Sequence, residues 1–212
     1  NIKKIISSKD KNNKQSLLDV GCAYGPFLKA AKENCFDCYG IDVSKDAVEY
    51  VNNQLNIQAY CGEFPKIILN QCFDKVKFNV ITMWYVIEHF AKLDDVLKMI
   101  NKSLLKNGCF AFSTPALNGI SGKFNKKSFF LKSPIDHFTI WHSFKCKKIL
   151  KNYGFNVKKV VSTGHHPERL PFLSQKAKNN KKLMNFLLFL SKIFRLGDTC
   201  EIYCIKIREI NE

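Results

Sequence analysis

Two short segments of the chain combine residue types that can do chemistry. Leu18-Asp19-Val20-Gly21-Cys22-Ala23-Tyr24-Gly25 joins a carboxylate to two glycines at the end of an apolar run. Such a segment is typical of a strand that turns sharply into a helix, where glycines let the backbone approach a ligand and the helix offers free N–H groups. Glu88-His89 places a carboxylate beside an imidazole, and both groups are common in proton transfer. We therefore expect a ligand-binding turn around Gly21 and a proton-transfer site around His89.

The glycine spacing argues against a dinucleotide as the ligand. A G-x-G-x-x-G fingerprint cradles a pyrophosphate, whereas this chain has Gly21-x-Ala23-x-x-Pro26 and lacks the second and third glycines. Asp42, at the end of the next apolar run, could accept hydrogen bonds from both hydroxyls of a ribose. Cys61-Gly62-Glu63-Phe64 adds a carboxylate and an aromatic ring, which suit the amine and the face of an adenine. An ordinary glycine turn and a helix-capping role for Asp42 are the alternatives to an adenosine site.

Apolar runs alternate with amphipathic stretches along the whole chain. We predict strands at residues 16–20, 38–42, 57–60, 78–83, 109–112, 157–161 and 201–207. We predict helices at 25–33, 44–53, 93–105, 143–152 and 181–194, with Ser44 and Ser143 as caps and residues 116–136 as a loop. This order implies an α/β fold with a Rossmann-like, doubly wound, mostly parallel seven-stranded sheet and a C-terminal antiparallel hairpin strand. Ligands of such sheets bind at the carboxyl ends of the strands, where both segments above lie.

The bulk composition leaves several partners open. The 212 residues suit a single domain, and 34 Lys+Arg against 18 Asp+Glu give a net charge of +16. That charge could indicate nucleic acid, an anionic membrane surface or an acidic substrate, or only solvated lysines spread along the chain. The nine cysteines are an odd number in a chain too large to need disulfides, which favours reduced thiols and a cytoplasmic location. The apolar run at 183–194 is shorter than the ~20 residues that span a bilayer.

Five pieces of the sequence together resemble the class I S-adenosylmethionine-dependent methyltransferases. They are Leu18 to Gly25, Gly40-Ile-Asp42-Val43-Ser44, Phe78 to His89, Leu104 to Gly108 with Ser113-Thr-Pro115, and Asp136 to Phe144 with Tyr153-Gly-Phe155. The likeness is greatest to the group that includes the ubiquinone-biosynthesis O-methyltransferases, and it covers about Ser16 to Val161. Each piece is weak alone, but their combination and order are specific.

The resemblance implies a set of residues that bind S-adenosylmethionine. Around the methionine part it implies Asp19, Gly21, Cys22, Ala23 and Gly25, with Tyr24 closing over it, although Ala23 stands where the family usually has a glycine. Asp42 would hold the ribose and Val43 would pack on the adenine, flanked by Gly62, Glu63 and Phe64. Met83 and Trp84 would line the wall near the sulfonium.

Methyl transfer needs positioning, exclusion of water and, for a hydroxyl acceptor, a base. Glu88 and His89 are the candidates for catalysis, with His89 as the base; a purely structural role is the alternative. Some relatives bind a divalent metal with a Glu three residues before this pair. Tyr85 occupies that position here, so we expect no metal. His137, Trp141 and His142 are candidate contacts to the acceptor, with loop packing as the alternative.

The expected protein is a cytoplasmic methyltransferase with one domain over residues 1–212, acting on a small-molecule or lipid-like acceptor, with oxygen as the methylated atom. Its cofactor core would be 16–113, and 114–142 and 164–198 would be an acceptor-side loop and a lid insertion. Lysines before the apolar run at 183–190 would allow peripheral contact with an anionic membrane. RNA or another macromolecule as the acceptor, and a non-catalytic scaffold that binds the cofactor, are the alternatives.

Overall fold

The structure is a computed structural model that describes residues 1–6, 14–67, 69–73 and 77–210. Its strands are β1 (Ser16–Val20), β2 (Asp37–Asp42), β3 (Gln58–Cys61), β4 (Phe78–Trp84), β5 (Leu104–Pro115), β6 (Phe155–Thr163) and β7 (Thr199–Lys206). Its helices are α1 (Ile2–Ile5), α2 (Pro26–Glu33), α3 (Lys45–Leu55), α4 (Leu69–Cys72), α5 (Leu93–Ser103), α6 (Ile120–Phe124), α7 (Lys126–Leu131), α8 (Cys146–Asn152), α9 (Gln175–Lys178) and α10 (Lys181–Ile193), with 3₁₀ turns η1 (Ile87–His89) and η2 (Pro167–Arg169).

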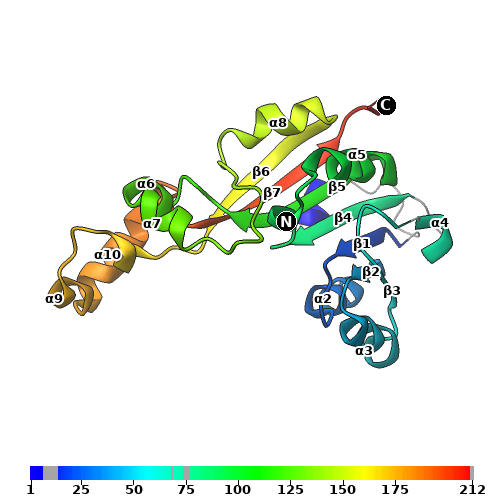
Figure 1. The fold of residues 1–212 in the computed structure, drawn as a ribbon, viewed down its shortest axis with the longest axis horizontal. Coiled ribbons are helices and arrows are strands. Elements are labelled where there is room, and N and C mark those ends of the chain that lie inside the picture. The colour runs from blue at the N-terminus through cyan, green and yellow to red at the C-terminus, as the bar shows by residue number, and fades with distance from the viewer. Residues whose placement is uncertain (7–13, 68, 74–76, 211–212) are drawn as a thin grey trace.

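All seven strands form one sheet in the order β3-β2-β1-β4-β5-β7-β6 (Figure 1). The first five strands are parallel, and β7 lies between β5 and β6 antiparallel to both. The sequence-based prediction of a Rossmann-like sheet with a final antiparallel strand is therefore confirmed. The order reverses between β1 and β4, so the carboxyl ends of these two strands form the crevice where ligands of such sheets bind.

Helices cover both faces of the sheet, which explains why the strands read as continuous apolar runs. Side chains from α5 and α8 pack on one face, around Ile81 and Phe110. Side chains from α2 and α3 pack on the other, around Leu17 and Val80. Every residue of β1 is buried. Ser44 caps α3 as predicted, since its hydroxyl accepts a hydrogen bond from the N–H of Ala47 at 3.3 Å.

The largest local differences from the predicted elements concern the end of α5, the segment at 116–136 and the start of α8. Helix α5 ends at Ser103 rather than 105, because Leu104 already pairs with β4, so Asn107-Gly108 falls within β5 instead of ending the helix. The expected loop at 116–136 contains the short helices α6 and α7. Ser143 does not cap α8, which begins at Cys146; its N–H and hydroxyl donate to Asn118 Oδ1 instead.

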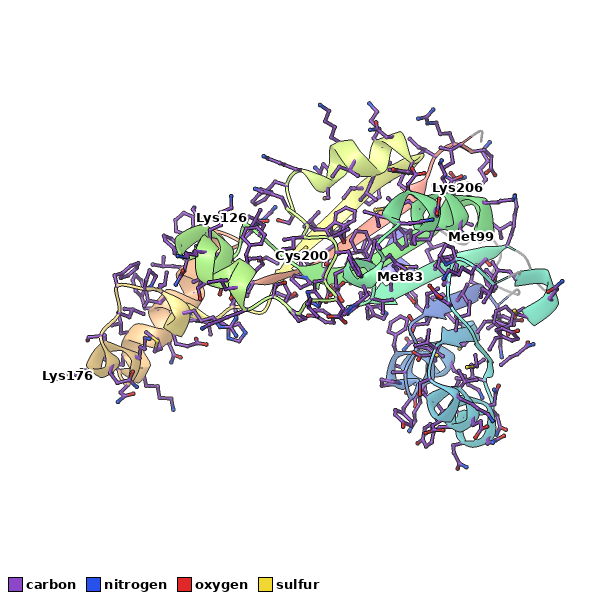
Figure 2. All side chains as sticks on the ribbon, in the orientation of Figure 1. Met83, Met99, Lys126, Lys176, Cys200 and Lys206 are labelled. Carbon is purple, nitrogen blue, oxygen red and sulfur yellow. The ribbon has the colours of Figure 1, made fainter. Side chains whose placement is uncertain are left out.

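Helices α6, α7, α9 and α10 form a lobe beyond one end of the sheet (Figure 1). Lys126 and Lys176 lie on this lobe, well away from Met83 in the middle of the sheet, as Figure 2 shows. Asp198 joins the lobe to the sheet: its buried carboxylate accepts hydrogen bonds from the N–H and hydroxyl of Ser121 and from Arg169 Nη1. Among the described residues, no helix is both long enough and apolar enough to cross a membrane.

Candidate functional site

The turn between β1 and α2 has the backbone geometry that its glycines allow. Gly21 and Gly25 have φ angles of +73° and +71°, and Gly25 is the N-cap of α2. The N–H groups of Gly21 and Cys22 donate to the carbonyl of Ile41 at 2.7 and 3.1 Å, which fastens the turn to β2. A Cβ on Gly21 would lie 2.3 Å from Val86 Cγ2. The turn therefore packs directly against the segment that leads into Glu88 and His89.

Asp42 holds the same turn from the end of β2. Its Oδ2 accepts a hydrogen bond from the N–H of Ala23 at 2.8 Å, and its Oδ1 accepts one from the N–H of Ser44 at 2.9 Å. Each carboxylate oxygen has a further lone pair, so these bonds leave acceptor capacity for the hydroxyls of a ribose. Asp42 thus has a structural task as well as its predicted role in ligand binding.

Asp19 is a buried carboxylate at the end of β1. Its Oδ1 accepts a hydrogen bond from Thr82 Oγ1 at 2.6 Å, and only 2% of the residue is exposed. Burial raises the pKa of Asp19 to about 7, the Thr82 hydrogen bond opposes that rise, and the nearby charge of Asp42 adds to it. A cation bound beside Asp19 would stabilise its ionised form, and the ammonium group of a bound methionine moiety would supply one.

The residues expected around the adenine fall into two groups. Val43 and Tyr24 are exposed by 72% and 57%, and the Tyr24 ring meets that of Tyr50 edge to face, so an apolar surface is open beside Asp42. Glu63 is exposed and paired with Lys66 at 2.8 Å, next to Gly62. The ring of Phe64, by contrast, is buried and packs against Phe90. The assignment of Phe64 to the adenine stays a prediction.

Met83 and Trp84 point to opposite faces of the sheet at the end of β4. Met83 is fully buried in the core on the α5 side. Trp84 packs on Phe27 at a ring distance of 5.0 Å and lines a cleft of about 450 Å³ beside α1 and α2. Their predicted position near the sulfonium remains untested.

Residues 136–139 lie against the η1 turn although about 50 residues separate them in sequence. The N–H groups of Phe138 and Thr139 donate to the carbonyl of Glu88 at 2.8 and 3.3 Å. As a result Asp136 Oδ2 lies 3.0 Å from His89 Nδ1, and the rings of His89 and His137 meet edge to face at 4.8 Å. We call Glu88, His89, Asp136 and His137 the acid–histidine cluster.

The cluster contains two groups whose pKa values are shifted by burial. Glu88 is 1% exposed, and its Oε2 has no hydrogen-bond partner among the described residues. Burial raises the pKa of Glu88 and the charge of Asp136 adds to the rise, while the backbone N–H of Glu88 and the neighbouring His89 oppose it. Burial and the neighbouring His89 lower the pKa of His137. The charge of Asp136 opposes this lowering, and the net effect favours the uncharged form of His137.

The cluster also has the donor set of a metal site. One ligand atom each from Glu88, His89 and His137 lies within 4.8 Å of the others, a spacing at which a metal ion could be held. Tyr85, where some relatives have a further carboxylate, has a φ angle of +58° and is half exposed. The sequence predicts no metal here, because Tyr85 replaces the carboxylate of those relatives. That prediction is worth testing, because Glu88, His89 and His137 lie close enough to hold an ion.

The other two predicted acceptor residues are Trp141 and His142. Trp141 is 3% exposed, packs on Phe112 at 5.0 Å, and lies in the core. His142 is half-buried and its Nδ1 has no hydrogen-bond partner among the described residues. Their contact with an acceptor is untested, whereas His137 lies within the cluster.

Sequence reasoning missed Thr82 and Asp136. The register of β1 and β4 places Thr82 opposite Asp19. The one hint in the sequence is that Thr82 is a polar residue inside an apolar strand. Asp136 directly precedes His137, but nothing in the sequence indicated that this segment lies on Glu88.

A family model described as a methyltransferase domain matches residues 2–160 of the chain. The ubiquinone biosynthesis O-methyltransferase of Pelagibacter ubique (strain HTCC1062) is 33% identical over 115 residues, which are 51% of this chain and 46% of that protein. The chain therefore spans about half the length of this curated relative.

Solved structures share the fold over nearly the whole chain. An S-adenosylmethionine-dependent methyltransferase from Archaeoglobus fulgidus has a TM-score of 0.63 and 16% identity, covering 92% of this chain and 87% of that one. Another from Mesorhizobium loti has a TM-score of 0.62 and 12% identity, covering 92% and 93%. At these identities the likeness concerns the fold alone.

Proposed function

The chain belongs to the methyltransferase domain family. We propose that it transfers a methyl group from S-adenosylmethionine to a hydroxyl oxygen of a small-molecule or lipid-like acceptor, with His89 as the base. The contact between Asp136 Oδ2 and His89 Nδ1, at 3.0 Å, carries this proposal. A carboxylate on Nδ1 favours the tautomer whose Nε2 is free to accept a proton, and stabilises the imidazolium that results. The match to an O-methyltransferase supports oxygen as the methylated atom.

The residues at the carboxyl ends of β1 and β2 fit the cofactor. Gly21 and Gly25 allow the turn its positive φ angles and its close packing on Val86 and Leu55. Asp19 would offer a buried carboxylate to the ammonium group, and Asp42 has lone pairs for the ribose. When bound, S-adenosylmethionine supplies an electrophilic methyl group on a sulfonium. The protein's own task is then to hold the acceptor hydroxyl in line with that group and to remove its proton.

The acid–histidine cluster is placed for this task. His89 takes the proton on Nε2, Asp136 holds the ring by Nδ1, and His137 limits its rotation by edge-to-face contact. Val86, three residues before His89, touches the glycine turn. This contact links the segment that carries the base to the cofactor turn, and removal of the acceptor's proton during methyl transfer requires a base near the cofactor.

Calorimetric titration with S-adenosylmethionine and S-adenosylhomocysteine, with NAD as the control ligand, tests the cofactor site first. Turnover is then followed by S-adenosylhomocysteine release with a panel of catechols and phenols. We expect His89→Gln to lower kcat by roughly 10²-fold or more, as for the loss of a general base, with unchanged cofactor affinity. Full activity in that variant would leave His89 as a structural residue. Cofactor binding without turnover on any acceptor class would favour the scaffold alternative.

Peripheral membrane contact through α10 is a second part of the proposal. Phe186, Phe189 and Ile193 lie on one face of this helix and are 57%, 58% and 55% exposed, with Lys182 and Lys192 nearby. Aromatic side chains on one face beside lysines suit the interface of an anionic bilayer. Flotation with phosphatidylglycerol vesicles should recover the protein, and Phe186→Ser with Phe189→Ser should abolish recovery. Equal recovery with phosphatidylcholine alone would contradict the role of charge.

An RNA acceptor remains the competing reading, and the net charge of +16 is the observation that favours it. Activity on RNA that falls steeply between low and moderate salt would support it. Activity on small hydroxyl acceptors that changes little with salt would support the proposal above.

A further inference from the structure

A cavity of about 600 Å³ with mixed polar and apolar walls lies between the lobe and the end of the sheet. Its walls come from the end of β5, helices α6, α7 and α9, the η2 turn and the start of β7. His137 is one of the lining residues and also belongs to the acid–histidine cluster. A molecule in this cavity could therefore reach the proposed base, and the position suits an acceptor.

The lining is rich in cations and hydroxyl groups. The cations are Lys132, Lys178 and Arg169. The hydroxyl residues are Ser121, Ser128, Ser133 and Thr199. The side-chain ammonium groups of Lys132 and Lys178 form no ion pair or hydrogen bond within the part of the chain that the structure describes. Two unpaired ammonium groups beside hydroxyls are the surroundings that a phosphate or carboxylate prefers.

The two acidic residues of the cavity, Glu168 and Asp198, offset part of this charge, but three cations against two carboxylates still leave the lining with a net positive formal charge. Asp198 is buried and already accepts hydrogen bonds from Ser121 and from Arg169 Nη1, the latter at 2.8 Å. Glu168 is half exposed and its Oε1 lies 2.9 Å from His166 Nδ1, outside the group of cavity lysines. The Arg169 side chain is still half exposed, so its remaining N–H groups add to the positive character of the cavity.

We propose that this cavity binds an anionic group of the acceptor, a phosphate or a carboxylate, through Lys132, Lys178 and Arg169, and directs the acceptor hydroxyl toward His137 and His89. This inference rests on the methyltransferase function proposed above. It narrows the acceptor from any small or lipid-like hydroxyl compound to one that carries a negative charge, and it disfavours a neutral quinol with only apolar substituents in this cavity.

The test compares two catechols that differ by one carboxylate, 3,4-dihydroxybenzoate and catechol, by titration in the presence of saturating S-adenosylhomocysteine. We expect the carboxylate to improve affinity at least about tenfold, the equivalent of one good charge contact. Lys132→Ala with Lys178→Ala should remove that difference. Lys127→Ala with Lys176→Ala is the matched control, because it removes the same charge from exposed positions on α7 and α9 that do not line the cavity.

Two further ligands identify the source of the anion. Inorganic phosphate represents a free anion, and monomeric dihexanoyl-phosphatidylglycerol represents a lipid headgroup. Weaker binding of either in the cavity variant but not in the control supports the proposal and names the source. Equal losses in both variants, or equal affinity for the two catechols, would overturn it. S-Adenosylhomocysteine binding is measured in the same samples, so a failure of the proposed function appears as loss of that binding and is distinguished from a failure of the cavity assignment.

Discussion

Asp19→Asn should stabilise the ligand-free protein while weakening cofactor binding. The folded protein raises the pKa of Asp19 from 3.8 to about 7, chiefly by burial. A shift of this size corresponds to roughly 4 kcal/mol in favour of the protonated form. The folded state therefore holds a proton that the unfolded state has lost between these pH values, and the free energy of unfolding contributed by Asp19 falls as pH rises from about 4 to about 7. Above pH 7 the folded protein bears the full free-energy cost of burying the ionised carboxylate.

An amide of the same shape removes that penalty and can still accept the hydrogen bond from Thr82. We expect the midpoint of thermal unfolding of Asp19→Asn to match the wild type near pH 4 and to exceed it at pH 8. Even half of this free energy, roughly 2 kcal/mol, would raise the midpoint by about 4 °C or more in a chain of this length. Differential scanning calorimetry without ligand, at a series of pH values, measures this directly.

The same substitution should lower the affinity for S-adenosylhomocysteine by about tenfold at pH 8, because the ammonium of the ligand loses its anionic partner. Wild-type affinity should also fall as pH drops below 7, since protonation of Asp19 removes the same partner. Asp95→Asn, at an exposed position on α5, controls for the loss of one surface charge. If Asp19→Asn lowers the unfolding midpoint at pH 8, Asp19 is stabilised in its charged form and the reasoning fails.

Three other substitutions or treatments test separate parts of the structure. Gly21→Ala should destabilise the turn and reduce cofactor affinity, because φ is +73° and the new methyl group would meet Val86 at 2.3 Å; wild-type affinity by calorimetry would refute the predicted contact. EDTA should leave turnover unchanged, whereas loss of activity that zinc or magnesium restores would make the acid–histidine cluster a metal site. Lys206 Nζ donates hydrogen bonds to Asn101 O at 2.5 Å and to Leu104 O at 2.7 Å. Lys206→Met would leave both carbonyls without these donors, so it should lower the free energy of unfolding, measured by urea titration, by about 2 kcal/mol. Unchanged stability of that variant would show that water satisfies these carbonyls.

The sheet was predictable because its signals are local. Strands buried on both faces need continuous apolar runs, and the turn after β1 needs glycines where φ is positive, so sequence alone indicates both. The position of Asp42 at the end of β2 follows from the same pattern. The end of α5 was less predictable, because a buried lysine about 100 residues later and the pairing of Leu104 with β4 decide it.

The residues of the candidate site also differ in how far the sequence could predict them. The sequence could point to Gly21, Asp42, Glu88 and His89 as candidates, because each follows an apolar run that ends at the carboxyl edge of a parallel sheet; their roles stay predictions. Tertiary structure alone brought Asp136 onto His89, through backbone hydrogen bonds between segments about 50 residues apart. It also placed Lys132, Lys178 and Arg169 around one cavity. Spacing along the chain encodes which local conformation a segment adopts, but contacts between distant segments depend on how whole elements pack, and no short pattern records that packing.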